Sequence, residues 1–290
     1  MYTTRFAPTP SGPLHFGSLV TLLGAWLRAR SQGGRILLRI EDLDTPRCPP
    51  GMTKRVLSDL KTLAFDFDGP TLFQSARIEF YESEIQRLIK TGFAFACTCT
   101  RESLKHTPCR CFERHKAPAD GSVFSIRFKA KDPISGIFDD GLLGPVNTLD
   151  RYDFITLKRS DGIISYNLAC VADDLETGVT EVVRGQDLIN VTPRQIALSK
   201  ALGSEGFSYL HLPLAMRDKD LKLSKQNHAR AITGIMAPGT ALALALSFLG
   251  QECSWITSGM TCQEILSRSI DVFDLSRVPK NSAPAPAGTF

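Results

Sequence analysis

The sequence has no long hydrophobic run, which argues against a membrane-spanning protein. A membrane helix needs roughly 18 or more consecutive apolar residues, whereas the longest apolar stretch near the start, residues 19–27, is interrupted by Thr21 and Gly24. The first five residues also lack the basic and then apolar layout of a secretory signal peptide. We therefore expect a cytoplasmic protein.

The composition is not that of a disordered, fibrous or disulfide-stapled protein. Of the 290 residues, 43% are hydrophobic and 22% are charged, which is ordinary for a globular protein. The formal net charge is only +4, so a polyanionic partner is permitted but not required. A chain this long does not need disulfides. Four of its eight cysteines fall within fifteen residues, which points to a bound metal ion.

Alternating strand and helix patterns predict an α/β fold with a parallel sheet and helices on both faces. Before residue 93 the expected strands are Tyr2–Ala7 and Arg35–Ile40, and the expected helices are Leu14–Arg30, Gly51–Leu63 and Arg77–Lys90. After residue 151 the expected strands are Phe154–Lys158, Ile163–Tyr166, Val179–Val183 and Tyr209–Leu214. The helices expected there are Leu168–Asp174, Pro193–Leu202 and Ala241–Leu249.

The pattern between these two parts is different, with cysteines, turn signals and short strands such as Val123–Lys129. We therefore expect residues 1–92 and 152–237 to form the two halves of one domain, with residues 93–151 as an inserted subdomain. Residues 238–290 should form a short helical part and a tail. From Pro279 onward the chain is rich in proline and alanine, and we expect that tail to be mobile.

Residues 8–18, Pro-Thr-Pro-Ser-Gly-Pro-Leu-His-Phe-Gly-Ser, form the first candidate site, a turn between a strand and a helix. Free backbone N–H groups at a helix start attract phosphate, and Gly17 lets a ligand approach the backbone. His15 can donate to a phosphate oxygen, although an isolated His-x-Gly is more often an ordinary helix cap. The glycine patterns of dinucleotide-binding folds and P-loops are absent.

The second candidate site is Lys222-Leu-Ser-Lys225-Gln, which follows the last predicted strand of the α/β domain. Two lysines three residues apart on a flexible loop can bring positive charge to a triphosphate. Alone, such a loop is usually a solvated surface.

Together, the His15-Phe-Gly17-Ser18 turn and the Lys222–Gln226 loop resemble the two signatures of the class I aminoacyl-tRNA synthetases. Four further stretches resemble the glutamate-specific branch of that class: residues 5–12, 39–44, 181–188 and 209–214. The resemblance implies a Rossmann-like catalytic domain into which a small acceptor-binding-like domain, residues 93–151, is inserted.

Chain length narrows the resemblance to the glutamyl-queuosine tRNA(Asp) synthetases, which are truncated paralogues of the glutamyl-tRNA synthetases. Only about sixty residues follow Lys225, too few for an anticodon-binding domain. Members of this family activate L-glutamate with ATP and Mg²⁺ and transfer it to queuosine in the anticodon of tRNA(Asp). We expect a monomer. Three alternatives remain: a conventional glutamyl-tRNA synthetase core that charges the tRNA 3′ end, a small-molecule adenylyltransferase, and a tRNA-binding module without activity.

The resemblance also implies roles for individual residues. Glutamate carries two carboxylates and one ammonium group, and buried charges need partners. Arg5 and Arg184 are the expected cations, and Glu41 is the expected anion. The implied glutamate site comprises Arg5, Phe6, Ala7, Pro8, Thr9, Glu41, Tyr166 and Arg184. The implied ATP site comprises His15, Gly17, Ser18, Lys222 and Lys225, of which His15 and Lys225 are the expected catalytic residues.

Cys97-x-Cys99 and Cys109-x-Cys111 supply four thiolates, which fit a tetrahedral structural zinc site. The resemblance supports zinc in the insertion, but the family pattern has a tyrosine and then one cysteine after Cys-x-Cys, and no tyrosine lies between Cys99 and Cys111. Either Cys111 replaces that tyrosine, or a nearby histidine contributes. The candidate histidines are His106 and His115, and the remaining cysteines, expected in the core or at the surface, are Cys48, Cys170, Cys253 and Cys262.

Overall fold

A central parallel sheet is assembled from two separate stretches of the chain in the computed structural model, which describes residues 1–100, 102–114, 118–148, 154–218, 221–222 and 231–289. In the first stretch β1 (Thr3–Phe6) pairs with β2 (Arg35–Ile40), which pairs with the short β3 (Leu72–Phe73). In the second, β9 (Glu181–Gly185) pairs with β10 (Ser208–Leu212).

The two stretches meet at β1 and β9. The backbone N–H of Thr180 donates to the carbonyl of Thr3 at 2.8 Å, so the start of β9 lies beside β1. The carboxyl ends of these parallel strands therefore reach the same edge of the sheet, where ligands of α/β proteins bind. The α/β fold class and the parallel sheet are as predicted.

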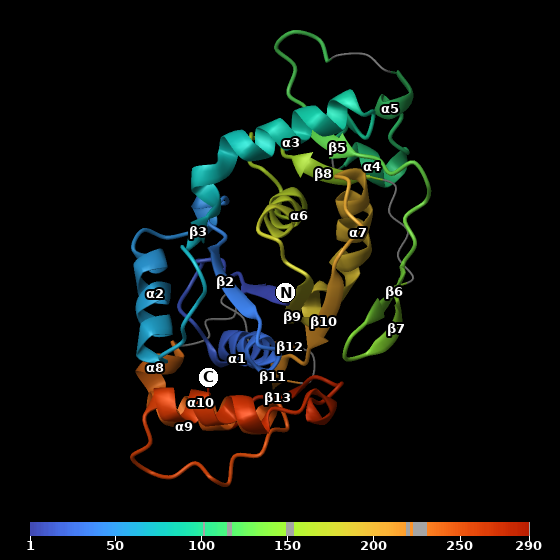
Figure 1. Cartoon of the computed structure of the whole chain (residues 1–290). Coiled ribbons are helices and arrows are strands. Elements are labelled where there is room, and N and C mark those ends of the chain that lie inside the picture. The colour runs from blue at the N-terminus through green and yellow to red at the C-terminus, as the bar shows by residue number, and fades with distance from the viewer. Residues whose placement is uncertain (101, 115–117, 149–153, 219–220, 223–230, 290) are drawn as a thin grey trace.

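Helices cover both faces of the central sheet (Figure 1). The longer helices are α1 (Phe16–Ser31), α2 (Met52–Thr62), α3 (Ile78–Lys90), α6 (Tyr166–Glu176), α7 (Thr192–Ala201), α9 (Pro238–Phe248) and α10 (Cys262–Val272), and α8 (Ile232–Ile235) is one turn long. Short 3₁₀ segments occur at Thr45–Arg47, Gln74–Arg77, Gln186–Val191 and Leu275–Arg277. Helix α10 is not among the predicted helices, although Thr261 and Glu264 form a capping box at its start. No helix in the described ranges has the length and apolar character needed to cross a membrane.

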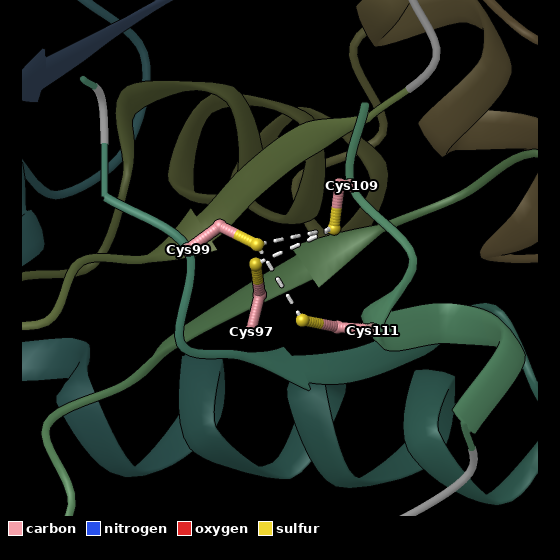
Figure 2. A group of neighbouring side chains, drawn as sticks. All are labelled: Cys97, Cys99, Cys109 and Cys111. Atoms are coloured by element: carbon pink, nitrogen blue, oxygen red, sulfur yellow. Dashed lines mark hydrogen bonds between the residues drawn. The ribbon is translucent and has the colours of Figure 1, made fainter. Parts of the chain in front are cut away.

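A smaller, antiparallel sheet consists of β4 (Ala94–Cys97), β5 (Ser125–Phe128) and β8 (Ile155–Lys158). Two one-turn helices, α4 (Ser103–His106) and α5 (Cys111–Arg114), lie between β4 and β5 in the chain, and four cysteines gather there (Figure 2). One face of this sheet packs against α3 and α6 in a hydrophobic core separate from that around α1.

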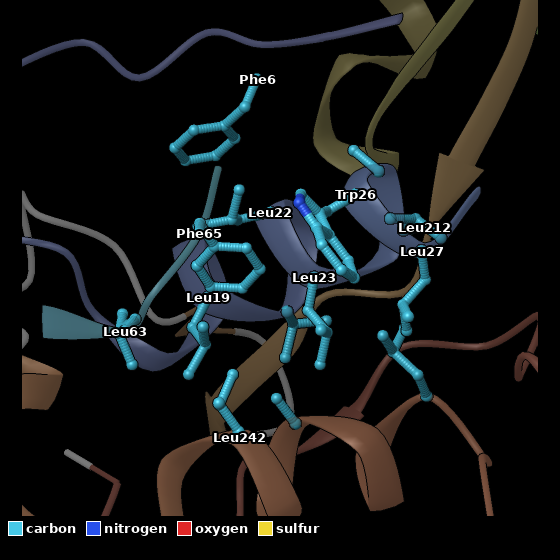
Figure 3. Packing of buried hydrophobic residues seen from close by; sticks show 14 of the residues in the cluster. Phe6, Leu19, Leu22, Leu23, Trp26, Leu27, Leu63, Phe65, Leu212 and Leu242 are labelled. Atoms are coloured by element: carbon cyan, nitrogen blue, oxygen red, sulfur yellow. The ribbon is translucent and has the colours of Figure 1, made fainter. Parts of the chain in front are cut away.

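Helix α1 is buried between the central sheet and the C-terminal helices. Its buried residues at helical spacing are Leu19, Leu22, Leu23, Trp26 and Leu27. They pack in one cluster with Phe6 of β1, Phe65 and Leu242 of α9 (Figure 3). Burial of one such side chain contributes roughly 1.5–3 kcal/mol, so this core holds the start of α1 against the end of β1.

Two strands pair across the predicted boundaries of the insertion. β6 (Ile137–Asp140) forms a hairpin with β7 (Gly144–Asn147) and also pairs with β10 of the central sheet, although residues 93–151 are predicted as one insertion. β8, predicted in the second half of the catalytic domain, pairs with β5 of the small sheet. Residue spacing identifies a strand but not its partner. Burial decides here, because Phe138 packs with β9 and β10 whereas Leu157 packs with α3 and α6.

The segment Ile163–Tyr166, predicted as a strand, makes only an isolated bridge between Ile164 and Lys158. Ser165 instead caps helix α6, because its side chain accepts a hydrogen bond from the backbone N–H of Leu168. Tyr166 is consequently the first residue of α6 and not part of a strand.

The C-terminal tail is packed, which corrects the prediction of a mobile tail. β13 (Ala283–Pro284) pairs with β11 (Ala215–Asp218), which pairs on its other side with β12 (Leu221–Lys222). The backbone N–H of Ala285 donates to the carbonyl of Met216 at 2.7 Å, and Thr289 is buried. Small and proline residues suit the edge of a sheet, and composition alone does not reveal the partner strand.

Candidate active site

A cavity of about 360 Å³ opens at the carboxyl ends of β1, β2 and β9 and at the start of α1. It is lined by all eight residues of the predicted glutamate site, namely Arg5, Phe6, Ala7, Pro8, Thr9, Glu41, Tyr166 and Arg184. Three residues of the predicted ATP site line it as well: His15, Gly17 and Ser18. A larger, mostly apolar cavity of about 830 Å³ lies between α3 and the small sheet, and none of these residues lines it.

The structure describes only one of the two lysines of the predicted ATP site, and only through its backbone pairing. Lys222 pairs through its backbone with Met216 of β11, and the adjacent Ala215 lines the cavity. Lys225 lies outside the described residues.

His15 is both the N-cap of α1 and part of the cavity wall. Its Nδ1 accepts a hydrogen bond from the backbone N–H of Ser18 at 3.3 Å, so a neutral imidazole carries its proton on Nε2. The ordinary helix cap considered from the sequence is therefore present, with Nε2 as the protonated nitrogen of the neutral ring. The positive end of the α1 dipole reaches the same cavity.

Asp174 of α6 joins two buried arginines behind the cavity. Both of its oxygens accept from Nε of Arg5, at 3.1 and 3.2 Å, and Arg39 Nη1 donates to its Oδ1. Burial opposes ionisation, but the charges of Arg39 and Arg5 outweigh it and lower the pKa of Asp174. The fixed carboxylate thereby neutralises the Arg5 side of the cavity.

Glu41, just beyond β2, is the acidic member of the predicted glutamate site. Its Oε1 accepts from Arg39 Nη2 at 3.3 Å and from the Cys170 thiol at 3.1 Å, and its Oε2 accepts from the Thr9 hydroxyl at 3.4 Å. Burial and the charge of Glu41 raise the pKa of Cys170, which therefore stays a neutral donor. These three donors therefore orient the Glu41 carboxylate, and Glu41 still lines the cavity.

Tyr166 lies at the start of α6 and lines the same cavity. Its pKa is raised well above the ordinary value by burial, with further contributions from Cys170 and Glu41. The hydroxyl therefore remains protonated and can donate to an anionic ligand.

Arg184, near the end of β9, is 4% exposed, and its hydrogen-bond partners among the described residues are uncharged. Nε donates to His211 Nε2 at 3.1 Å, Nη1 donates to Gln195 Oε1 at 2.6 Å, and Nη2 donates to Thr192 Oγ1 at 2.7 Å and to the Leu188 carbonyl at 3.5 Å. None of these groups carries a negative charge. A buried guanidinium held in this way is prepared for an anionic ligand.

Several residues that hold cavity residues in place, directly or, for Asp140, through His211, are absent from the predicted set. They are Arg39, Asp140, Cys170, Asp174, Gln195 and His211. Cys170 is buried, as expected, but it also contacts Glu41. The available signal was a polar residue inside an apolar pattern, such as His211 in Tyr-Leu-His-Leu-Pro or the acidic pair at 173–174 in an apolar helix.

The four clustered cysteines meet in space, as Figure 2 shows. The Sγ–Sγ distances are 3.6 Å for Cys97–Cys109 and for Cys99–Cys111, and 3.9 Å for Cys99–Cys109. A tetrahedron with Zn–S bonds of about 2.3 Å has sulfur–sulfur separations of about 3.8 Å. The observed spacing fits that geometry.

Cys111 rather than His106 completes the cluster. His106 is exposed and contacts Glu102, with His106 Nε2 at 3.4 Å from the carboxylate. His115 lies outside the described residues.

A family model described as "tRNA synthetases class I (E and Q), catalytic domain" matches residues 1–250. The chain is 44% identical over 284 residues to a protein of Vibrio parahaemolyticus named glutamyl-Q tRNA(Asp) synthetase, covering 96% of this chain and 94% of the relative. It is 41% identical to the protein of that name from Shewanella amazonensis, with 96% and 95% covered.

Solved structures with a similar fold include two from Elizabethkingia. A glutamate-tRNA ligase of Elizabethkingia meningosepticum, solved with its amino acid, superposes with a TM-score of 0.78 at 25% identity. The glutamate-tRNA synthetase of Elizabethkingia anophelis gives a TM-score of 0.79 at 23% identity. Each alignment covers 99% of this chain and 68% of the solved one.

Proposed function

Because the chain belongs to the glutamyl-Q tRNA(Asp) synthetase family of the class I tRNA synthetases, we propose that it activates L-glutamate with ATP and transfers it to queuosine in the anticodon of tRNA(Asp). The cavity supplies the observation that carries this proposal. Arg184 offers a buried positive charge whose hydrogen bonds within the described part of the chain include no anionic partner, and Glu41 offers a carboxylate on the same cavity.

An amino acid with an acidic side chain matches this pattern of charge. One glutamate carboxylate would pair with Arg184, and the ammonium group would pair with Glu41. Arg5, Tyr166 and the backbone of residues 6–9 would contact the remaining polar groups. A bidentate guanidinium–carboxylate contact is among the strongest polar interactions in proteins, which supports selection of glutamate over amino acids with neutral side chains.

The proposed first step is adenylation. An oxygen of the glutamate α-carboxylate attacks the α-phosphorus of ATP, the bond from that phosphorus to pyrophosphate breaks, and glutamyl-AMP forms. No side chain acts as a nucleophile. His15 Nε2–H and the N–H groups at the start of α1 stabilise charge on the phosphates, and we propose that Lys225 does the same, with a lesser part for Lys222. Mg²⁺ would accompany ATP.

The proposed second step is acyl transfer. A hydroxyl of the queuosine cyclopentenediol attacks the glutamyl carbonyl carbon and loses its proton to solvent or to the leaving phosphate. The bond from that carbon to the AMP oxygen breaks, an ester forms, and AMP leaves with the bonding electrons. All of these substrates are found in the cytoplasm, which is the location we propose. The expected monomeric state remains a prediction.

We also infer that Cys97, Cys99, Cys109 and Cys111 hold one zinc ion. The sulfur spacing supports it, and four thiolates form a closed site that leaves no position for a reacting ligand. The ion would therefore be structural, and it would hold the segment between β4 and β5.

Two measurements with purified protein test the proposed reaction. Glutamate-dependent exchange between ATP and pyrophosphate, measured without tRNA, should be well above background, because all the proposed pocket residues lie in this chain. Transfer of labelled glutamate should then occur to tRNA(Asp) that contains queuosine and not to tRNA(Asp) that lacks it. Labelling of the 3′ end of tRNA(Glu) would instead support a conventional glutamyl-tRNA synthetase. Absence of exchange would refute glutamate activation.

A further inference from the structure

His211 of β10 is a fully buried histidine that contacts the carboxylate of Asp140 and the cavity residue Arg184. Its Nδ1 lies 2.7 Å from Oδ2 of Asp140, and its Nε2 accepts from Nε of Arg184 at 3.1 Å. Thr192 Oγ1 is also 3.1 Å from this Nε2. His211 does not line the cavity, whereas Arg184 does.

These contacts determine the tautomer of His211. The guanidinium Nε–H is always a donor, so Nε2 of His211 must present its lone pair. The proton of the neutral ring is then on Nδ1, where it donates to Asp140. A proton on Nε2 would place two donors against each other in a buried site, which is unfavourable.

Asp140 is fixed so that it can impose this tautomer. Its Oδ1 accepts from the backbone N–H groups of Leu142 and Leu143, both at 3.0 Å, and its Oδ2 also accepts from the backbone N–H of His211 at 3.1 Å. Burial alone would raise its pKa, but the hydrogen bonds from His211 and from the backbone outweigh burial and lower it. The carboxylate therefore stays ionised and accepts from Nδ1.

We propose that Asp140 and His211 are positioning residues for Arg184, and that this carboxylate–imidazole–guanidinium relay sets the affinity for the glutamate carboxylate. Asp140 directs the lone pair of His211 toward Arg184, and His211 fixes the rotation of the guanidinium without neutralising it by direct contact. Asp174, in contrast, contacts and neutralises Arg5. The proposal rests on the proposed function, in which Arg184 binds a carboxylate of the substrate.

The relay also predicts a dependence on pH. Protonation of His211 removes the acceptor for Arg184 and places a second positive charge beside it. Burial lowers the pKa of His211; the hydrogen bond that the ring donates to Asp140 opposes this shift, Arg184 adds to it, and Asp187 opposes it. The other groups that face the ring are neutral: Thr192, and the rings of Tyr209 and Phe138. Glutamate affinity should therefore fall only as pH drops below the ordinary histidine value of about 6.5.

Steady-state exchange kinetics of matched variants test the relay. His211→Leu removes the acceptor and should raise the glutamate KM at least tenfold, while the ATP KM changes less than twofold. His211→Gln places an amide oxygen near the position of Nε2 and should remain within about threefold of the parent. Asp140→Asn should raise the glutamate KM at least tenfold in the His211 background, because the tautomer reverses. In the His211→Gln background, Asp140→Asn should raise the glutamate KM less than threefold.

Glu181→Gln is the control for loss of a buried carboxylate elsewhere in the same sheet, because Glu181 contacts Tyr2 and Arg28 outside the cavity. It should lower Tm and leave the glutamate KM unchanged. Equal effects of His211→Leu and His211→Gln, or an Asp140→Asn effect that is the same in both backgrounds, would overturn the relay. The acid rise in glutamate KM should also disappear in His211→Gln.

A spectroscopic measurement separates failure of the relay from failure of the proposed function. Imidazole ¹⁵N NMR, assigned by the signal that His211→Gln removes, should show the Nδ1–H tautomer for His211 in the parent and the Nε2–H tautomer in Asp140→Asn. An Nε2–H tautomer in the parent would overturn the relay whether or not the protein activates glutamate. Parent protein with the expected tautomer but no exchange would refute the function alone.

Discussion

The cavity and the cysteine cluster hold their polar groups in opposite ways. The cavity brings together residues from β1, from the end of β2, and from α6, β9 and β11, which are up to 210 positions apart, counting from Arg5 to Ala215. Its charged side chains are already paired or hydrogen-bonded within the protein. The cluster takes all its groups from fifteen consecutive residues, and its four thiols contact mainly one another. The first site is therefore maintained by the fold, whereas in our proposal the second is completed by a zinc ion.

This difference predicts that each site can be broken without the other. Loss of a side chain from the cavity should abolish substrate use and leave metal content unchanged. Loss of the metal should disturb the small sheet and leave the cavity in place. Measurements on both sites in each variant therefore test the comparison directly.

Arg184→Ala should have the largest effect. Removing one partner of a desolvated charge pair costs roughly 3–5 kcal/mol, and about 1.4 kcal/mol corresponds to a factor of ten. The glutamate KM in the exchange reaction should rise at least a hundredfold, with the ATP KM and zinc content nearly unchanged. Arg184→Lys, which keeps the charge but not the fork of donors, should fall between this variant and the parent. A glutamate KM within threefold of the parent would remove Arg184 from the proposed site.

Lys225→Ala should lower kcat for activation by about 100-fold or more. A positive charge that stabilises the departing pyrophosphate acts mainly in the transition state. Loss of one such donor lowers the rate on the order of 100- to 1,000-fold. The glutamate KM should change only a few-fold. Lys222→Ala is the matched control and should be milder. A greater effect of Lys222→Ala would reverse the assignment of the two lysines.

Removal of the metal should have a smaller effect on activation. Metal analysis of protein purified without chelator should give one zinc ion per chain, and Cys111→Ser should reduce that amount. Because the small sheet has its own core with α3 and α6, unfolding should remain local. Hydrogen exchange should increase between β4 and β5, while activation kcat stays within about threefold of the parent. Loss of activation together with the metal would show that the two sites are coupled.

The residues of the proposed glutamate site were easier to select from the sequence than the contacts that orient them. Residues 5–9 are contiguous, Glu41 directly follows β2 and Arg184 lies near the end of β9, and the resemblance of these short stretches to the synthetase family is what pointed to them. The Asp174–Arg5 and His211–Arg184 contacts join residues from different strands and helices, and residue spacing does not encode such pairs. The fold class follows from periodicity, but the partner of β6 and that of β13 depend on tertiary packing.

The smallest effect should come from removing residues 279–290, which tests whether the fold around the cavity depends on the tail. The Ser282 hydroxyl accepts from the backbone N–H of Leu214 at 2.9 Å, and Gln186 Nε2 donates to the Lys280 carbonyl at 2.7 Å. Leu214 and Ala215 line the cavity and lead into β11, which β13 extends.

Each lost hydrogen bond is worth about 0.5–1.5 kcal/mol net, and water replaces part of that where the bond is exposed. A change of about 1 kcal/mol shifts Tm by roughly 2–4 °C in a protein of this size. The shortened chain should therefore melt several degrees lower and activate glutamate a few-fold more slowly, with KM values and zinc content unchanged. Ser282→Ala, which removes one bond, should show a fraction of the Tm shift. An unchanged Tm and kcat in the shortened chain would mean that β13 pairs with β11 without supporting it, and that the cavity edge is held by the central sheet alone.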